Sequence, residues 1–105
     1  MLISGGTVRS LKFTKAGNHL LAGNDYGEIF VLDISRGIPI DIIQSYSTKA
    51  IWSIDVSWDD QLVALGSEEG TIELYNLQKI LLSTSSSGGV GGGGKVPLTG
   101  GVVVH

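Results

Sequence analysis

Two stretches of this chain repeat one another and decide its fold. Residues 22–33 read AGNDYGEIFVLD, and residues 65–76, which lie 43 positions later, read LGSEEGTIELYN. Each contains a glycine, then a polar turn that ends in a second glycine, and then an apolar-rich run. A glycine at the end of such a turn supplies the positive φ that tight hairpins need. Both stretches therefore predict a strand, a tight turn and a second strand.

The repeat extends on both sides of these stretches, because residues 8–34 align without a gap on residues 51–77. Four aligned pairs are identical: Ser10 with Ser53, Gly23 with Gly66, Gly27 with Gly70, and Ile29 with Ile72. In the first copy, turn residues separate four short apolar-rich segments, which are 8–14, 20–23, 28–34 and 38–44. Pro39 cannot donate a hydrogen bond to a neighbouring strand, so the last segment is expected at a sheet edge. No segment shows a convincing 3.6-residue stripe, which predicts an all-β chain.

Composition excludes several classes of protein. The 105 residues hold seven basic and ten acidic side chains, a net charge of −3, so a basic footprint for nucleic acid is absent. There is no cysteine, which excludes disulfide scaffolds and thiolate metal sites. No window approaches the roughly 18–20 apolar residues of a membrane span, and the first residues lack the features of a signal peptide. We expect a soluble intracellular protein.

No pattern in the sequence assembles a catalytic, cofactor or metal site. His19 and His105 are too few for a metal cluster, and the acidic pairs at 59–60 and 68–69 occupy turns, where such residues are common. Residues 89–95 have the glycine-to-lysine spacing of a phosphate-binding loop but lack the Ser or Thr that must follow. We predict that the protein is not an enzyme and has no catalytic residues, cofactor or metal.

Four short strands per unit, at a period of about 40–45 residues, are typical of a propeller blade. Residues 8–17 and 22–33, together with the second copy of the latter at 65–76, resemble the repeat of the WD-repeat (β-propeller) family. The resemblance implies two four-stranded antiparallel blades, at about 8–44 and 51–82, within residues 1–82. A flexible Ser/Gly-rich linker and a short apolar tail would then occupy residues 83–105.

The chain departs from the family pattern at its polar positions. The Trp-Asp dipeptide of the repeat is Leu32-Asp33 in one copy and Tyr75-Asn76 in the other, and no histidine stands near Tyr46. The resemblance therefore implies that these blades lack the familiar buried hydrogen-bond tetrad and depend on apolar packing.

Two blades do not close a ring, since propellers typically have four to eight. We expect a partial propeller whose remaining blades come from the same chain or from another polypeptide. We expect the isolated chain to be unstable, because its open faces should aggregate. The alternative is a small open β-sheet protein of unknown role.

Trp52, Trp58 and Arg9 are the candidate partner-binding residues. Trp52 aligns with Arg9 in the first strand, which in the family lies near the central channel and its rim. Trp58 lies in a turn that does not itself need a large ring. Tryptophan is enriched at binding hot spots, so exposed rings would favour contact with a partner. The alternatives are packing of both rings against a neighbouring blade, and a solvated rim for Arg9.

The predicted function is a protein–protein interaction scaffold. Within the family, residues 49–54 and 70–79 are most similar to the C-terminal repeats of the WD-repeat TBP-associated subunits shared by TFIID and SAGA. That resemblance implies histone-fold partner subunits, a role in transcription and a nuclear location, without direct contact to nucleic acid or membrane. The alternative is a scaffold in ribosome biogenesis, ubiquitin ligation or trafficking.

Overall fold

The computed structural model describes residues 6–86 and 102–104, which form two four-stranded antiparallel sheets and one helix. The first sheet has the strand order β1-β2-β3-β4 and the second the order β5-β6-β7-β8. This arrangement confirms the predicted pair of antiparallel sheets, but only three strands of the second sheet lie within the predicted residues 51–82. The strands are β1 (Val8–Phe13), β2 (His19–Asn24), β3 (Glu28–Asp33), β4 (Ile38–Gln44), β5 (Ile51–Val56), β6 (Leu62–Ser67), β7 (Ile72–Asn76) and β8 (Val102–Val104).

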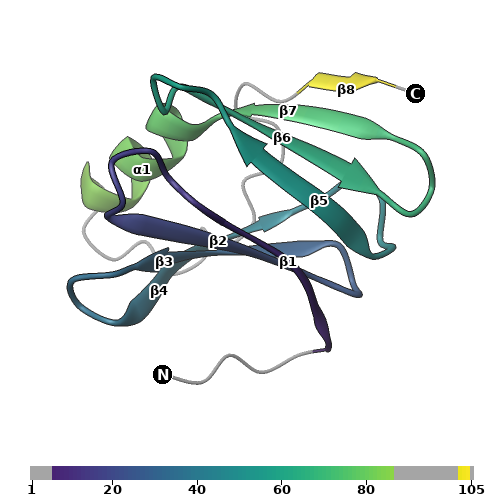
Figure 1. The fold of residues 1–105 in the computed structure, drawn as a ribbon, viewed down its shortest axis with the longest axis horizontal. Helices are drawn as coiled ribbons and strands as arrows, with labels where there is room; N and C mark the ends of the chain where they lie inside the picture. Colours follow the sequence, from purple (N-terminus) through teal and green to yellow (C-terminus); the bar gives the residue numbers. More distant parts are fainter. Residues whose placement is uncertain (1–5, 87–101, 105) are drawn as a thin grey trace.

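The two sheets stack face to face, with the second sheet over the first (Figure 1). Their facing side chains form the main core. β2, β3 and β4 supply one side of it, β5, β6 and β7 supply the other, and α1 closes one end. Its fully buried members include Leu21, Ile29, Val31, Ile43, Ile51, Val63, Leu65 and Tyr75. Burial of this apolar surface holds the two sheets together.

The predicted edge position of Pro39 is confirmed. Among the described strands, β4 is the outermost of the first sheet and pairs only with β3. Pro39 lies opposite Leu32, next to a register irregularity between Val31 and Leu32. A proline is tolerated there because its missing N–H interrupts no central ladder.

The prediction that no segment forms a helix is wrong for α1 (Leu77–Ser86). Leu77 and Ile80 are fully buried and Leu81 packs beside them, which makes a short apolar stripe at helical spacing. The Asn76 side-chain oxygen accepts the Lys79 N–H at 2.9 Å and caps the first turn. α1 covers one end of the core, where it contacts β4 and β6 (Figure 1). No helix in the described ranges is long and apolar enough to cross a membrane.

The short apolar tail supplies the fourth strand of the second sheet. Val102 pairs with Leu74 and Val104 pairs with Ile72, so β8 runs antiparallel to β7. α1 also includes residues 83–86 of the stretch that we predicted as a linker. The rest of that stretch, residues 87–94, lies outside the described residues, as does the glycine-rich candidate phosphate loop.

Gly27, in the turn between β2 and β3, lies against the segment that connects the first sheet to the second. It has φ +77°, and a Cβ placed on it would lie 2.2 Å from the carbonyl oxygen of Ser47. Gly17 has a similar φ of +81°, but a Cβ there would meet nothing within 4 Å. Both glycines therefore need a left-handed backbone, but only Gly27 lacks room for a side chain.

Replacing Gly27 by alanine should destabilise the protein more than replacing Gly17. Both variants carry a left-handed penalty of about 1–2 kcal/mol, and Gly27→Ala adds an overpacking cost of about 1–3 kcal/mol. Thermal unfolding at one fixed protein concentration measures the difference. Equal losses of stability in the two variants would contradict the close approach of Gly27 to residue 47.

Candidate protein-binding site at the start of β1 and β5

β1 and β5 lie side by side where the sheets meet, and residues at equivalent repeat positions face each other there. The Lys12 ammonium lies 3.3 Å from a carboxylate oxygen of Asp55, its counterpart 43 residues later. The Ser10 hydroxyl donates a hydrogen bond of 2.8 Å to the carbonyl of Ile51. We refer to this β1–β5 contact as the seam.

Arg9 and Trp52 meet at the exposed end of the seam. The strand register shifts between Val8 and Ser10 in β1 and between Ile51 and Ser53 in β5, so Arg9 and Trp52 are the bulge residues of their strands. Bulges redirect side chains, and here the Arg9 guanidinium lies 5.2 Å from the centroid of the Trp52 ring. At that distance the cation is attracted to the face of the ring.

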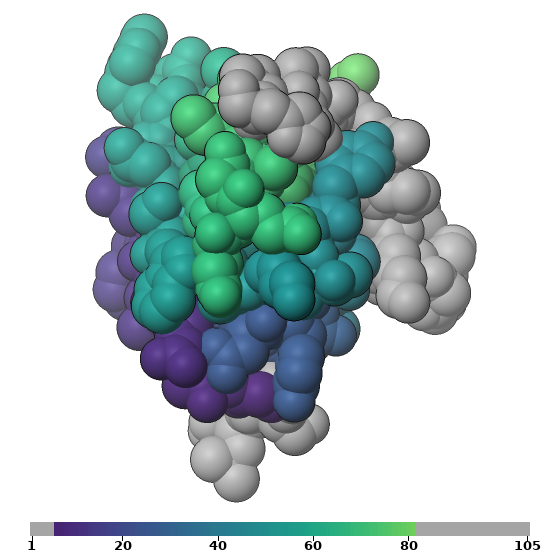
Figure 2. All heavy atoms as spheres, turned by 90° about the vertical axis from the view of Figure 1, so that its right-hand side faces the viewer, coloured from purple at the N-terminus to yellow at the C-terminus, as the bar shows by residue number. Residues whose placement is uncertain are grey.

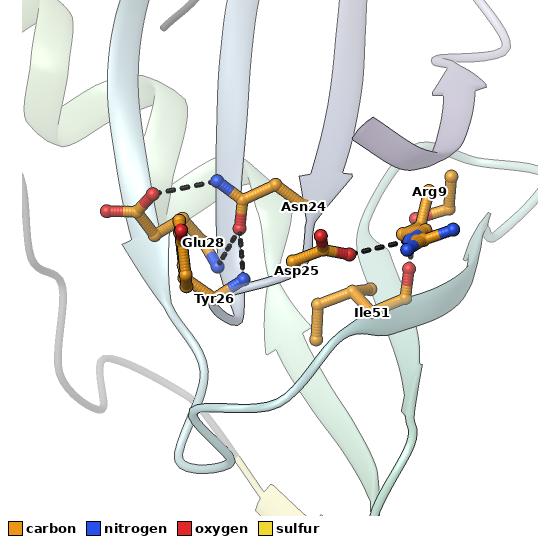
Figure 3. Close-up of polar contacts among 7 residues, drawn as sticks. Arg9, Asn24, Asp25, Tyr26, Glu28 and Ile51 are labelled. Carbon is orange, nitrogen blue, oxygen red and sulfur yellow. Dashed lines mark hydrogen bonds and ion pairs between the residues drawn. The ribbon is translucent and has the colours of Figure 1, made fainter. Parts of the chain in front are cut away.

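Asp25 completes this group on the other side of Arg9. The Arg9 Nε donates to Asp25 Oδ1 at 2.6 Å (Figure 3). The hydrogen bond from Arg9 is the largest cause of a lowered pKa of the Asp25 carboxyl. The carboxylate therefore stays charged and keeps Arg9 oriented. We refer to Arg9, Asp25 and Trp52 as the bulge cluster.

The turn that carries Asp25 is held by the buried side chain of Asn24. Its Oδ1 accepts the backbone N–H groups of Tyr26 and Glu28, at 2.9 and 3.0 Å, and its Nδ2 donates to the Glu28 carboxylate at 2.8 Å (Figure 3). Both the acceptor and the donor of the amide are used, which fixes the turn. Asp25 is thus presented from a rigid hairpin.

Two exposed tyrosines, which the sequence interpretation missed, lie at the same end of the molecule. Tyr26 belongs to the β2–β3 turn and Tyr46 to the segment between the sheets, and more than half of each side chain is exposed. Figure 2 shows that the β2–β3 turn in blue, the connecting segment in teal and the β6–β7 turn in green form one continuous face. The presence of a large aromatic residue in a polar turn was the signal that could have identified both.

Trp58 lies apart from this face. It belongs to the turn after β5, whereas Trp52 is near the start of β5, and six strand residues span about 20 Å. Trp58 is 85% exposed and Trp52 is 51% exposed. The structure therefore brings Arg9 and Trp52 together and separates both from Trp58.

Comparisons with known proteins agree with this architecture. A scan against protein-family models finds no match. A curated relative, U3 small nucleolar RNA-associated protein 12 of Saccharomyces cerevisiae, is 26% identical over 73 residues, which are 70% of this chain and 8% of that protein. The chain thus spans less than a tenth of the length of this relative.

Solved structures share the arrangement of strands. The β-propeller domain of Myceliophteria thermophila Cps50 (Swd1) has a TM-score of 0.67 at 20% identity, over 72% of this chain and 23% of that one. The WD40 repeats of RRP9 and the structure of U3-55K each have a TM-score of 0.70 at 13% identity, over 74% of this chain and 25% of theirs. The two sheets therefore have the fold of two adjacent β-propeller blades.

In addition to the apolar packing that we expected, a buried polar network links the two blades. The fully buried Glu73 carboxyl accepts the Ser45 hydroxyl, the Tyr75 hydroxyl at 2.7 Å and the Tyr46 N–H at 3.3 Å. Burial, followed by the contact with Glu73, raises the pKa of Tyr75 above its ordinary value, so its hydroxyl stays protonated and donates. Tyr75 stands where the WD-repeat pattern has its tryptophan. The network fastens the connecting segment onto β7 of the second blade.

The acidic pair at 59–60 has structural roles. The Asp60 carboxylate accepts the N–H groups of Lys15 and Ala16, at 2.7 and 3.0 Å, and so ties the first turn of one blade to the corresponding turn of the next. Asp59 accepts the Ser57 hydroxyl at 2.7 Å within its own turn. In the part of the chain that the structure describes, no three His, Asp or Glu side chains gather as a metal site would need.

Removing the Tyr75 hydroxyl should destabilise the pair of blades. Tyr75→Phe leaves the buried Glu73 with one donor fewer, which costs about 1–3 kcal/mol. Tyr46→Phe removes the same atom from an exposed ring and should change stability by about 0.5 kcal/mol or less. Denaturant unfolding of both variants at one concentration gives the comparison. Similar small changes in both would show that the network does not hold the blades.

Proposed function

We propose that this protein is a non-catalytic WD-repeat scaffold that binds protein subunits of a ribosome-biogenesis assembly of the U3 small nucleolar RNA type. The observation that carries the proposal is the similarity over 73 residues to a protein named for association with that RNA. The shared fold with U3-55K and the RRP9 repeats adds support. These similarities favour ribosome biogenesis over the TFIID/SAGA hypothesis. They also favour a nucleolar location within the nucleus.

The bulge cluster is the proposed contact for a protein partner. It presents a half-exposed tryptophan ring and an arginine that Asp25 already orients, so little side-chain entropy is lost on binding. Tryptophan and arginine are the residue types that dominate binding energy at protein interfaces. The net charge of −3 does not favour direct contact with RNA phosphates. Trp58, at the other end of β5, remains a separate candidate contact.

Mild purification of the tagged endogenous protein, followed by mass spectrometry, tests the proposal. We expect pre-ribosomal proteins in the eluate, together with U3 RNA that is detected by reverse transcription and lost when those proteins are removed. Histone-fold subunits of TFIID or SAGA, with no pre-ribosomal proteins, would contradict ribosome biogenesis and favour the transcription hypothesis.

Trp52→Ala should lower the recovery of the partner proteins by about tenfold or more, because loss of a hot-spot ring costs at least about 2 kcal/mol. Trp58→Ala is the matched control, since it removes the same ring from the opposite end of the molecule. Unchanged recovery with Trp52→Ala would exclude the bulge cluster as the contact. A loss only with Trp58→Ala would move the contact to the turn after β5.

A further inference from the structure

The seam joins two different surfaces. A Cβ placed on Gly23 in β2 would lie 2.8 Å from the Cβ of Ile51, so the Ile51 side chain sits directly over that glycine. The first blade offers a socket of Ser10, Gly23, Ile29 and Val31, with Leu21 beside it. The second blade inserts a ridge of three β5 side chains, Ile51, Ile54 and Val56, which are at most 8% exposed. One blade thus receives a strand, and the other supplies it.

The repeat places a second socket on the second blade, and this socket is open. Ser53, Gly66, Ile72 and Leu74 occupy the positions of Ser10, Gly23, Ile29 and Val31, one repeat later. Ile72 is 51% exposed, whereas its counterpart Ile29 is fully buried. Among the described residues, a Cβ placed on Gly66 would meet only the side chain of Ser53 within 4 Å, so no described strand covers this glycine. We refer to these four residues as the open socket.

The first blade carries a ridge that is also open. Val8, Leu11 and Phe13 of β1 are the counterparts of Ile51, Ile54 and Val56. Leu11 is 61% exposed, whereas its counterpart Ile54 is 8% exposed. In the seam, β5 packs against β1 and β2 of the neighbouring blade, so the ridge strand is the part that a socket receives. We refer to Val8, Leu11 and Phe13 as the open ridge.

Charges flank the two open surfaces in a complementary way. Within the chain, Lys12 of β1 in the first blade faces Asp55 of β5 in the second blade. If the open ridge of another copy filled the open socket in the same manner, Asp55 of the first copy would face Lys12 of the second. Trp52 of the first copy would likewise meet Arg9 of the second. Acid would meet base and ring would meet cation, as they do in the seam.

We propose that a second copy of this chain inserts its open ridge into the open socket, head to tail, and repeats the seam between copies. The inference rests on the propeller-blade fold of the two sheets and goes beyond the proposed function, because it identifies the neighbouring blade. A head-to-tail contact generates a closed ring when its rotation closes. Since propellers have about four to eight blades and the described residues form two, a ring built of this 105-residue chain would contain about two to four copies.

Native mass spectrometry of the purified full chain, alone and as paired variants, tests the proposal. Leu11→Glu places a charge on the open ridge, and Ile72→Glu places one in the open socket. Both positions are exposed within the single chain, and circular dichroism checks that the strands remain. Ile38→Glu is the matched control, because Ile38 is a similarly exposed apolar residue on the edge strand β4. Phe13→Glu and Leu74→Lys form a second pair if either first variant loses its strands.

The unaltered chain and Ile38→Glu should form the same assembly, with a mass of about two to four times the 11.0 kDa of one chain. Each single variant should be a monomer, because one of its two surfaces is blocked. Mixed in equal amounts, Leu11→Glu and Ile72→Glu should form a one-to-one dimer and nothing larger, since each supplies the surface that the other lacks.

A folded monomer of the unaltered chain would overturn the proposal, as would dimers formed by either single variant alone. So would an assembly that neither substitution disturbs. A monomer that still recovers pre-ribosomal proteins from cells would overturn only the second copy as neighbour and leave the proposed function standing. Blades supplied by another part of the polypeptide or by another protein would then fill the two open surfaces.

Discussion

The packing of β5 on the first sheet is the contact on which the rest of the structure depends. Ile51 can lie over Gly23 only because that position has no side chain, and the Ser10 hydroxyl then reaches the Ile51 carbonyl. This close approach brings Lys12 to Asp55 and Arg9 to Trp52. A pair of exposed charges contributes little free energy by itself. The buried apolar side chains between the sheets therefore provide most of the stability, and the polar pairs set the register.

Polar groups fix the connection between the blades, although the polar residues of the WD-repeat pattern are absent. Glu73 is buried and accepts three hydrogen bonds, two of them from the segment that leads from β4 to β5. In the first blade the counterparts of Glu73 and Tyr75 are Phe30 and Leu32, which belong to a separate apolar cluster. The two blades therefore share one strand arrangement, but apolar side chains stand in the first blade where the second has a buried carboxylate and a tyrosine hydroxyl.

Local features of the sequence predicted most of the fold. The glycine-ended turns and the edge proline act through the backbone of a few residues, so their effect is visible without tertiary structure. α1 was missed because its apolar stripe comprises only Leu77, Ile80 and Leu81, and serines occupy much of its second half. Its stability comes from packing against the core, which the sequence alone does not display.

The candidate site was predicted in part. Arg9 and Trp52 align in the repeat, and first strands of adjacent blades lie side by side, so their proximity follows from the alignment. The strand bulges that turn both side chains toward each other left no signal in the sequence. The Glu73 network was also missed, because Ser45 and Glu73 are 28 residues apart and meet only in the folded chain.

Coupling of Lys12 to Asp55 by a carbodiimide tests the central claim most directly, because it forms an amide only between an amine and a carboxylate in contact. The reaction is run on an equal mixture of ¹⁵N-labelled and unlabelled chains, and the linked peptides are identified by mass spectrometry. The account predicts an excess of Lys12–Asp55 links in which both peptides carry the same label, and their loss in Asp55→Asn. Absence of a Lys12–Asp55 link within a single chain would contradict the seam.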